Sequence, residues 1–360
     1  MKKIKLFDPY VTKDEEISIL RTLKSHFWAS GAGVGNVQKF ENSFNKFIGS
    51  NQSVAVNSGT AALHLALSLF DLSDKEVILP SLSFVSTAHS VVMNKAKPVF
   101  LDVDEDTLCI DPNEIAEKIN HKTKALLPVH FGGMPCDLNK ISKLAKKHGA
   151  ELIEDAAHAV GSKYAGKPIG SHGKAVCFSF HPVKNLSMPT GGLIALNSRN
   201  SESLSKNLKS KRWCGITNRQ RTSYDVDKIG WNYYMNEFSA AIGIVQLKKL
   251  NKMSAIRKKI AKRYSEEIKT PLKMPFSKNC SYHLYWIRVK NRNHFMKEMQ
   301  RKNIETGIHY RPIHTMTYYK NKKSLPVTEK ISNEIVSIPI HTNLSENEIG
   351  KIIKTINEIS

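Results

Sequence analysis

The stretch Ser53–Leu67, SVAVNSGTAALHLAL, decides the fold class of this 360-residue chain. Its first residues, Ser53–Val56, predict a buried β-strand, and Ala61–Leu67 predicts a helix. Between them, Ser58-Gly59-Thr60 stands at the helix N-terminus. Free backbone amides and the helix dipole attract a phosphate there, and two hydroxyls add hydrogen bonds. An ordinary N-cap, which serine and threonine favour, is the alternative interpretation.

The same alternation of short apolar runs and helical patterns continues along the chain. Helices are expected at Thr87–Met93 and Leu138–His148, and the polar stretch Asn200–Ser210 is expected to be a surface loop. Further strands are predicted at Glu76–Pro80, Pro98–Val103, Ala125–His130, Glu151–Glu154, Ala175–Phe180 and Gly192–Leu196. This alternation predicts an α/β fold with a mostly parallel sheet covered on both faces. Its ligands should lie at the carboxyl ends of the strands.

A second pattern begins near Asn236. An apolar stripe from Phe238 to Leu250 and a basic stretch from Arg257 to Ile268 predict long helices. A short strand at Tyr285–Val289 and helices near 294–302 and 345–358 follow. We therefore expect a large domain over residues 1–250 and a smaller α+β domain over residues 251–360.

Composition narrows the class of protein. The formal net charge is +22, which fits either a nucleic-acid partner or a lysine-rich surface that attracts small anions. Lysines are spread along the chain, and no nucleic-acid-binding motif is present, so we expect no nucleic-acid partner. No apolar stretch is long enough to span a bilayer, which predicts no membrane partner. Five scattered cysteines without CxxC spacing favour a reducing cytoplasm and predict no metal site.

Lys184 is the candidate reactive residue. It lies in Ala175–Asn185, AVCFSFHPVKN, where an apolar strand leads into a polar turn before Gly191 and Gly192. A desolvated lysine amine has a pKa lowered from roughly 10.4 and can form a Schiff base with an aldehyde cofactor. A solvated surface lysine is the alternative in so lysine-rich a chain.

Four other residues complete a candidate site for pyridoxal 5′-phosphate (PLP). Asp155 ends a predicted strand, and its carboxylate can hold a pyridine nitrogen protonated or cap the next helix. His158 can hydrogen-bond a ring hydroxyl or be a core histidine. Phe84 can stack on a flat ring or belong to the core. Ser179, at another strand end, offers a second hydroxyl to the phosphate.

In order along the chain, these motifs resemble the nucleotide-sugar aminotransferases of the DegT–StrS group. The resemblance covers nearly the whole sequence, and it implies PLP-dependent transferase fold type I, with a large domain and a smaller C-terminal domain. The matching stretches are NSGTAALHLAL (57–67), LPSLSFVST (79–87), LIEDAAHAVG (152–161), FSFHPVKN (178–185), GWNYYMNEFSAAIGIVQL (230–247), GIHYRPIH (307–314) and SIPIH (337–341).

The resemblance implies a role for each candidate. Lys184 would carry the cofactor, and Asp155 would pair with the ring nitrogen. The ring would stack on Phe84 near His158, and its phosphate would bind Ser58, Gly59, Thr60 and Ser179. Asn232 would reach the phosphate of a neighbouring subunit, which implies a homodimer with shared active sites. His309 and Tyr310 match a substrate-binding motif.

The implied reaction is transamination in the cytoplasm. An amino donor, glutamate by resemblance, would supply the amino group to a keto carbon of a nucleotide-linked deoxysugar, with C4 favoured over C3. The product would serve surface polysaccharide, lipopolysaccharide or glycan biosynthesis. A PLP-dependent sugar dehydratase or isomerase and a DNA-binding regulator are the alternatives. Related dehydratases carry histidine where this chain has Lys184.

Two positions depart from the family pattern. Pro189-Thr190 stands where Gly-Glu is usual, and Tyr234 replaces an arginine. Both lie near the expected substrate channel, so they bear on sugar specificity.

Overall fold

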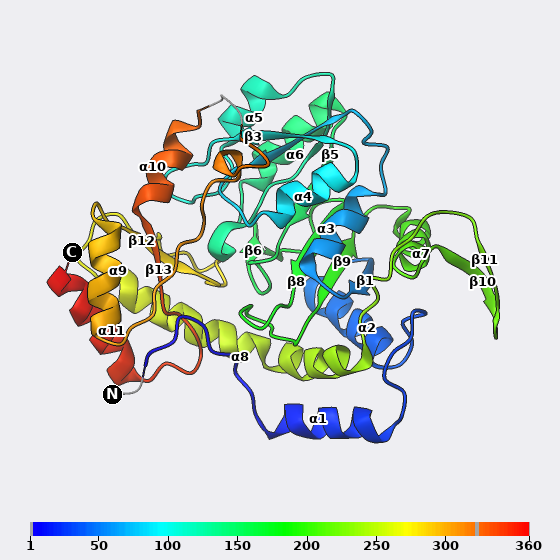
Figure 1. The fold of residues 1–360 in the computed structure, drawn as a ribbon, viewed down its shortest axis with the longest axis horizontal. Coiled ribbons are helices and arrows are strands. Elements are labelled where there is room, and N and C mark those ends of the chain that lie inside the picture. Colours follow the sequence, from blue (N-terminus) through cyan, green and yellow to red (C-terminus); the bar gives the residue numbers. More distant parts are fainter. Residues whose placement is uncertain (1–2, 321–323, 360) are drawn as a thin grey trace.

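The computed structural model describes residues 3–320 and 324–359. At its centre is a seven-stranded sheet in the order β1-β9-β8-β5-β4-β2-β3 (Figure 1). The strands are β1 (Gln52–Val56), β2 (Glu76–Pro80), β3 (Lys97–Leu101), β4 (Thr123–Leu126), β5 (Glu151–Asp155), β8 (Ala175–Ser179) and β9 (Gly192–Leu196). Only β9 runs antiparallel to its neighbours β1 and β8, so the predicted mostly parallel sheet is confirmed.

Helices cover both faces of this sheet, because apolar side chains alternate between its two sides. In β1, Ala55 packs into one core cluster, while Val54 and Val56 pack into the other. One face carries α3 (Gly59–Leu67), α4 (Ser86–Met93) and α7 (Ser201–Lys211). The other carries α2 (Asn36–Ile48), α5 (Pro112–Lys118), α6 (Leu138–His148) and part of α8 (Glu237–Glu267).

Two details of the predicted elements were wrong. Residues 200–210 form α7 rather than a loop, because Leu204 and Leu208 recur one turn apart and pack into the core. Two strands were also predicted to extend further than they do. After β3 and β4 the chain leaves the regular ladder, and Val103 and Val129 make only isolated bridges.

The C-terminal part is smaller and mixed in structure. The antiparallel pair β12 (Tyr285–Arg288) and β13 (Ile335–Ile338) packs with α9 (Arg292–Arg301), α10 (Pro326–Glu334) and α11 (Glu346–Ile359). Helix α8 is 31 residues long and runs unbroken across the expected boundary at residue 250 (Figure 1). The division into domains at that residue stays a prediction.

Three further elements lie outside the predicted pattern. Helix α1 (Lys13–Lys24) packs beside α8, and a hairpin of β6 (Lys163–Tyr164) and β7 (Lys167–Pro168) follows β5. The hairpin of β10 (Ile216–Gln220) and β11 (Ser223–Val226) projects from the body at the right of Figure 1, with most of its residues exposed. Within the described residues, no helix has both the length and the apolar character needed to cross a bilayer.

Candidate active site

The predicted site residues converge on a cavity of about 370 Å³ at the carboxyl ends of β1, β5 and β8. Of the eleven candidates, ten line this cavity: Ser58, Gly59, Thr60, Phe84, Asp155, His158, Ser179, Lys184, His309 and Tyr310. The first eight come from the large part of the chain, and His309 and Tyr310 come from the C-terminal part. The cavity therefore lies where the two parts meet.

One end of the cavity is the N-terminus of α3. Ser58 is the N-cap, and its Oγ accepts a hydrogen bond from the Ala61 amide at 3.1 Å. Within the described residues, the amides of Gly59 and Thr60 have no hydrogen-bond partner. The Thr60 hydroxyl lies 2.7 Å from the Ser86 hydroxyl at the start of α4. The N-cap interpretation is therefore confirmed, and two amides remain free to bind an anion.

Close backbone approach shapes this end. A Cβ atom built on Gly59 would lie 2.7 Å from the Cβ of Ser179, at the end of β8. A Cβ on Gly192 would lie 2.2 Å from the carbonyl oxygen of Ser58. Glycine at these two positions brings the α3 N-terminus and the β8 terminus together, so their hydroxyls face one cavity.

Asp155 ends β5, three places along the sheet from β1, lines the cavity and is only 4% exposed. One carboxylate oxygen accepts from the Thr87 hydroxyl at 2.8 Å, and the other accepts from the Ala157 amide at 3.1 Å. Burial nevertheless raises the pKa of Asp155, although both donors and the charge of Lys184 oppose the shift. The carboxylate is thus held in place but lacks a charged partner in contact, which a protonated ring nitrogen would supply.

Lys184 follows β8 and reaches into the cavity. Burial lowers the pKa of its amine to about 8, and the charge of Asp155 limits that shift. At a pKa of about 8, about a tenth of the amine is unprotonated at pH 7 and able to attack a carbonyl, far more than for an ordinary lysine. The solvated-surface alternative is excluded, because Lys184 is half-buried and its Nζ lies 3.4 Å from His283 Nε2.

His158 faces the cavity beside Lys184. Its Nδ1 accepts a hydrogen bond from the Gly132 amide at 3.2 Å, so a neutral ring carries its proton on Nε2. Burial, with the charge of Lys184, holds its pKa well below the usual range, which keeps the ring neutral. Nε2 lies 3.1 Å from the Tyr310 hydroxyl, and it is therefore oriented to donate into the cavity.

The remaining candidates that line the cavity are Phe84 and His309. Phe84 is 57% exposed and its ring centroid lies 6.1 Å from that of Tyr310, so it is not part of the core. His309 Nδ1 lies 2.9 Å from the Ser337 hydroxyl, and burial lowers the pKa of His309 to about 4. An exposed aromatic ring at the mouth is available to stack on a flat ligand.

Asn232 does not line the cavity. Its side chain is exposed, and its carbonyl oxygen accepts from the Asn57 side chain at 3.4 Å. Tyr234 makes an isolated bridge with Val56, so both residues lie on the segment beside β1. The departure at Thr190 has a structural role, because its hydroxyl donates to the Asn57 carbonyl at the rim of the cavity.

Sequence reasoning missed three residues of the site. Thr87 donates to Asp155, His283 contacts Lys184, and Phe7 lines the cavity from the N-terminal segment. Thr87 stands within the quoted stretch 79–87 and could have been recognised as an N-terminal helix residue near the strand ends. His283 and Phe7 have no local signal, because His283 lies in the C-terminal part and Phe7 lies in the N-terminal segment that packs against it.

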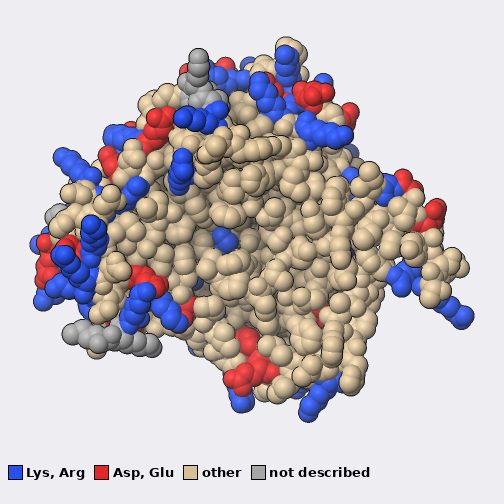
Figure 2. All heavy atoms as spheres, viewed as in Figure 1, with Lys and Arg blue, Asp and Glu red and all other residues tan. Residues whose placement is uncertain are grey.

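Charged side chains form no single patch on the face viewed in Figure 2. On the face viewed in Figure 2, lysines, arginines and acidic residues lie around the outline, while the middle is mostly uncharged. No basic stripe crosses that face, so the net charge of +22 offers no obvious track for a nucleic acid there. The described residues contain no group of three His, Cys, Asp or Glu side chains arranged to hold a metal ion.

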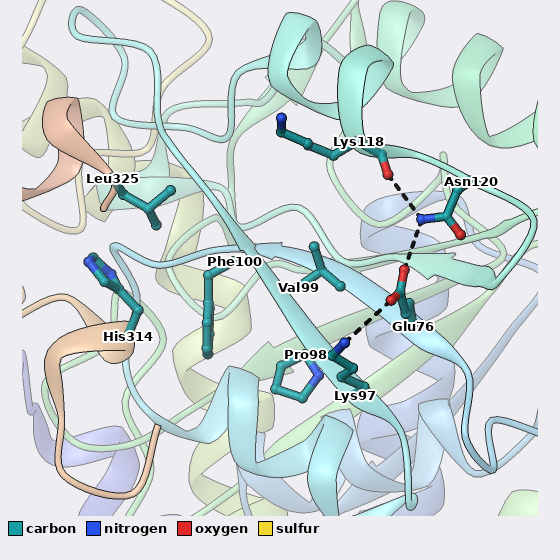
Figure 3. A pocket seen from close by; sticks show the side chains of 9 residues that line it. All are labelled: Glu76, Lys97, Pro98, Val99, Phe100, Lys118, Asn120, His314 and Leu325. Carbon is teal, nitrogen blue, oxygen red and sulfur yellow. Dashed lines mark hydrogen bonds and ion pairs between the residues drawn. The ribbon is translucent and has the colours of Figure 1, made fainter. Parts of the chain in front are cut away.

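A second cavity, of about 290 Å³, lies at the edge strand β3 (Figure 3). Its acidic group is already paired, because Glu76 contacts Lys97 at 3.7 Å and accepts from the Asn120 side chain at 2.9 Å. His314 is held between the Ser81 hydroxyl and Glu329. None of the candidate site residues lies there, and its polar groups are largely paired with one another.

The chemistry of the first cavity fits PLP. Free amides and hydroxyls at the α3 N-terminus suit a phosphate, and a buried carboxylate at the end of β5 suits a protonated pyridine nitrogen. Between them lie a primary amine of lowered pKa and a neutral histidine. The donors and acceptors thus match the phosphate, the carbonyl, the ring hydroxyl and the ring nitrogen of one molecule.

Comparison with known proteins relates this chain to aminotransferases. Residues 9–357 match the model of the DegT/DnrJ/EryC1/StrS aminotransferase family. An uncharacterized protein of Methanocaldococcus jannaschii is 33% identical over 379 residues, covering 98% of this chain and 96% of that protein.

Two solved structures are similar over almost the whole chain. The pyridoxamine phosphate form of Spr1654 from Streptococcus pneumoniae, assigned as a sugar aminotransferase, superposes with a TM-score of 0.94 at 26% identity, covering 99% of this chain and 98% of that one. PseC of Helicobacter pylori, an aminotransferase involved in the biosynthesis of pseudoaminic acid, has a TM-score of 0.94 at 27% identity, with 99% of both chains covered.

Proposed function

The chain belongs to the DegT/DnrJ/EryC1/StrS aminotransferase family as a PLP-dependent sugar aminotransferase of fold type I, and we propose that it moves an amino group from glutamate to a keto carbon of a nucleotide-linked deoxysugar. The observation that carries the proposal is the joining of Lys184, Asp155 and the α3 N-terminus in one cavity. We do not propose the alternative of a DNA-binding regulator, because the matching family and the similar solved structures are aminotransferases.

Lys184 is the proton-transferring group of the proposal. When PLP is bound, the cofactor supplies an aldehyde carbon to which the amino group can be attached and a ring that withdraws electrons from the reacting carbon. Lys184 Nζ, whose pKa is about 8, takes a proton from that carbon as the free amine and returns it as the ammonium. A pKa close to neutrality lets one group perform both transfers.

The other residues hold the ring and its phosphate. Asp155, fixed by Thr87 and Ala157, would keep the ring nitrogen protonated. His158 Nε2–H would donate to the ring hydroxyl. Ser58, Gly59, Thr60 and Ser179 would hold the phosphate at the α3 N-terminus, and Phe84 would stack on the ring.

The substrate would enter past the C-terminal part. His309 and Tyr310 line the same cavity and are placed to contact a sugar. Amination at C4 is proposed over C3, on the resemblance of the 307–314 segment. The net charge of +22 would raise the local concentration of an anionic, diphosphate-bearing sugar.

We further propose a cytoplasmic homodimer with shared active sites, acting in surface polysaccharide, lipopolysaccharide or glycan biosynthesis. Asn232 is exposed and lies outside its own cavity, which supports a contact with the phosphate of a neighbouring subunit. The four fully buried cysteines and the exposed Cys214 are all free, as a reducing compartment permits.

The test combines trapping and turnover. Borohydride added to the PLP-loaded protein should fix the cofactor on the peptide that contains Lys184, and Lys184→Ala should prevent this. A panel of nucleotide keto-sugars with glutamate should yield an amino sugar and 2-oxoglutarate in equal amounts. A Lys184→Ala protein that still aminates a sugar would refute the assignment, and sugar dehydration without 2-oxoglutarate would indicate a dehydratase instead.

A further inference from the structure

The amine of Lys184 has a single hydrogen-bond partner in the part of the chain that the structure describes. That partner is Nε2 of His283, at 3.4 Å. Asp155 acts on the amine only through its charge and makes no direct contact with it. His283 is 2% exposed and does not line the cavity, so it contacts the amine from behind the site.

Three hydrogen bonds fix the backbone around His283. The Asn185 side chain donates to the Ser281 carbonyl at 2.9 Å, so the residue after Lys184 is tied to this segment. Arg257 Nη1 donates to the Tyr282 carbonyl at 3.2 Å. The His283 amide donates to the Gly132 carbonyl at 2.9 Å. These contacts hold a left-handed Tyr282, with φ of 51°, immediately before the histidine.

The imidazole itself is held between two rings. Phe7 stacks on one side with ring centroids 5.6 Å apart and an interplanar angle of 18°, and His158 lies on the other with centroids 4.4 Å apart. Gly132 links the two histidines, since its amide donates to His158 and its carbonyl accepts from His283. The position of His283 is therefore coupled to the two groups that face the ligand, Lys184 and His158.

His283 is kept neutral by its surroundings. Burial comes first among the causes that hold its pKa well below the usual range, followed by the charges of Lys184, His158, Arg257 and His309. A neutral ring beside a lysine ammonium can accept a hydrogen bond but will not take the proton. Since Nε2 faces Lys184, the ring proton then lies on Nδ1, which is buried without a partner among the described residues.

We propose that His283 is a positioning residue for the reaction: its Nε2 accepts a hydrogen bond from the free ε-ammonium of Lys184 and holds that group in the cavity between its two proton transfers. The inference rests on the proposed function, in which Lys184 is released from the cofactor during turnover. No proton passes to His283, so the ammonium that forms when Lys184 takes a proton from one carbon keeps that charge until it delivers a proton to the next carbon. Without the ring nitrogen, a half-buried ammonium would have no partner, and its charged form would be disfavoured.

The experiment compares two substitutions of His283 in the full chain loaded with pyridoxamine 5′-phosphate, the form in which Lys184 is free. His283→Phe keeps an aromatic ring between Phe7 and His158 but removes both nitrogens, and His283→Gln keeps an acceptor. The pKa of Lys184 is measured by trace acetylation across a pH series, with the Lys184 peptide quantified by mass spectrometry. We expect His283→Phe to lower this pKa by about one unit and His283→Gln to leave it near the wild-type value.

Turnover is measured in parallel. We expect kcat of His283→Phe to fall about tenfold with KM little changed, and His283→Gln to recover most of the loss. His172→Phe is the matched control, because His172 also has a buried Nδ1 without a partner among the described residues, but its Nε2 contacts the Tyr164 carbonyl instead of Lys184. This substitution should change neither the pKa of Lys184 nor kcat.

Two results overturn the inference. One is an unchanged Lys184 pKa in a folded His283→Phe protein, and the other is a His283→Gln protein as impaired as His283→Phe. Either can occur while Lys184→Ala is inactive, in which case the proposed function stands and only the role of His283 is lost. If circular dichroism shows that His283→Phe does not fold, His283→Leu takes its place. His283→Gln and His283→Leu then compare a side chain that can accept a hydrogen bond with one that cannot.

Discussion

Asp155 carries a free-energy penalty in the folded protein that follows from its burial. Its carboxylate is 4% exposed, and two hydrogen-bond donors fix its orientation without neutralising its charge. Burial raises its pKa, so the folded state disfavours the charged carboxylate relative to the unfolded chain. Such a residue is retained at the expense of stability, which is expected of a group that acts on a ligand.

Asp155→Asn should therefore preserve the stability of the apo-protein while it lowers the activity of the PLP-loaded protein. Because the folded-state pKa of Asp155 is raised, the wild type loses stability as pH rises from the unfolded value of about 3.9 through the folded value. The amide cannot ionise and still offers an acceptor to Ala157 and a donor to Thr87. We expect the variant to be at least as stable as the wild type at neutral pH, by urea unfolding of the apo-protein.

The same variant should lose at least about a hundredfold in kcat, because the ring nitrogen would lose its counter-charge. The control is unfolding at a pH below the folded and unfolded pKa values of Asp155. There Asp155 is protonated in both states, so the wild type should no longer be less stable than the variant because of a buried charge. A variant that is clearly less stable at neutral pH would show that Asp155 is a structural residue.

At the scale of elements, the sequence predicted what local periodicity determines. The seven strands of the sheet and α3, α4 and α6 were expected from apolar runs, and they occur within a few residues of the expected bounds. Helix α7 was missed because its polar residues outnumber the two leucines that pack inward. The exposed hairpin β10–β11 has almost no buried side chains, so it carries no apolar pattern to recognise.

The residues of the site also fall into those that local sequence could predict and those that it could not. Residues at strand ends, such as Asp155 and Ser179, follow from position alone, because parallel strands bring their carboxyl ends to one edge. Phe7 and His283 arrive from segments whose place is set by packing between the two parts of the chain. No single stretch of sequence could have placed them beside Lys184.

The junction of α3 with β8 can be tested by a methyl group. Gly59→Ala would place a Cβ 2.7 Å from the Cβ of Ser179, so the helix N-terminus must move away from the strand end. We expect the free energy of unfolding to fall by about 1–3 kcal/mol and the affinity for PLP to fall as well. Urea midpoints of the apo-protein and fluorescence titration with PLP measure the two effects.

Gly350→Ala is the matched control for that substitution. Gly350 lies in α11, and beyond its chain neighbours and the backbone of its own helix, no atom lies within 4 Å of the position its Cβ would occupy. Alanine there should stabilise the protein by about 0.5–1 kcal/mol through helix propensity, with PLP affinity unchanged. Equal effects at the two glycines would argue against a close packing of α3 on β8.

At the scale of the whole molecule, one candidate residue stands apart from the cavity it is expected to serve. Asn232 is exposed on the segment beside β1, whereas the other ten candidates surround one space. Asn232 forms an isolated bridge with Trp213, just before the hairpin β10–β11 that projects at the right of Figure 1. A two-stranded hairpin with exposed faces is marginal on its own, and the proposed homodimer would supply a surface that covers it.

A homodimer with shared sites makes a quantitative prediction for mixed subunits. Lys184→Ala and Asn232→Ala should each be inactive as homodimers at limiting PLP, the first for lack of the amine and the second for lack of a phosphate ligand. When the two are unfolded, mixed equally and refolded, half of the dimers are heterodimers. In each heterodimer one site contains both mutations and the other contains neither, so activity should return to about a quarter of the wild-type value. Sites built within single chains would restore none, because no chain in the mixture carries both residues, and a mixture that stays inactive while forming heterodimers by native mass spectrometry would refute the shared site.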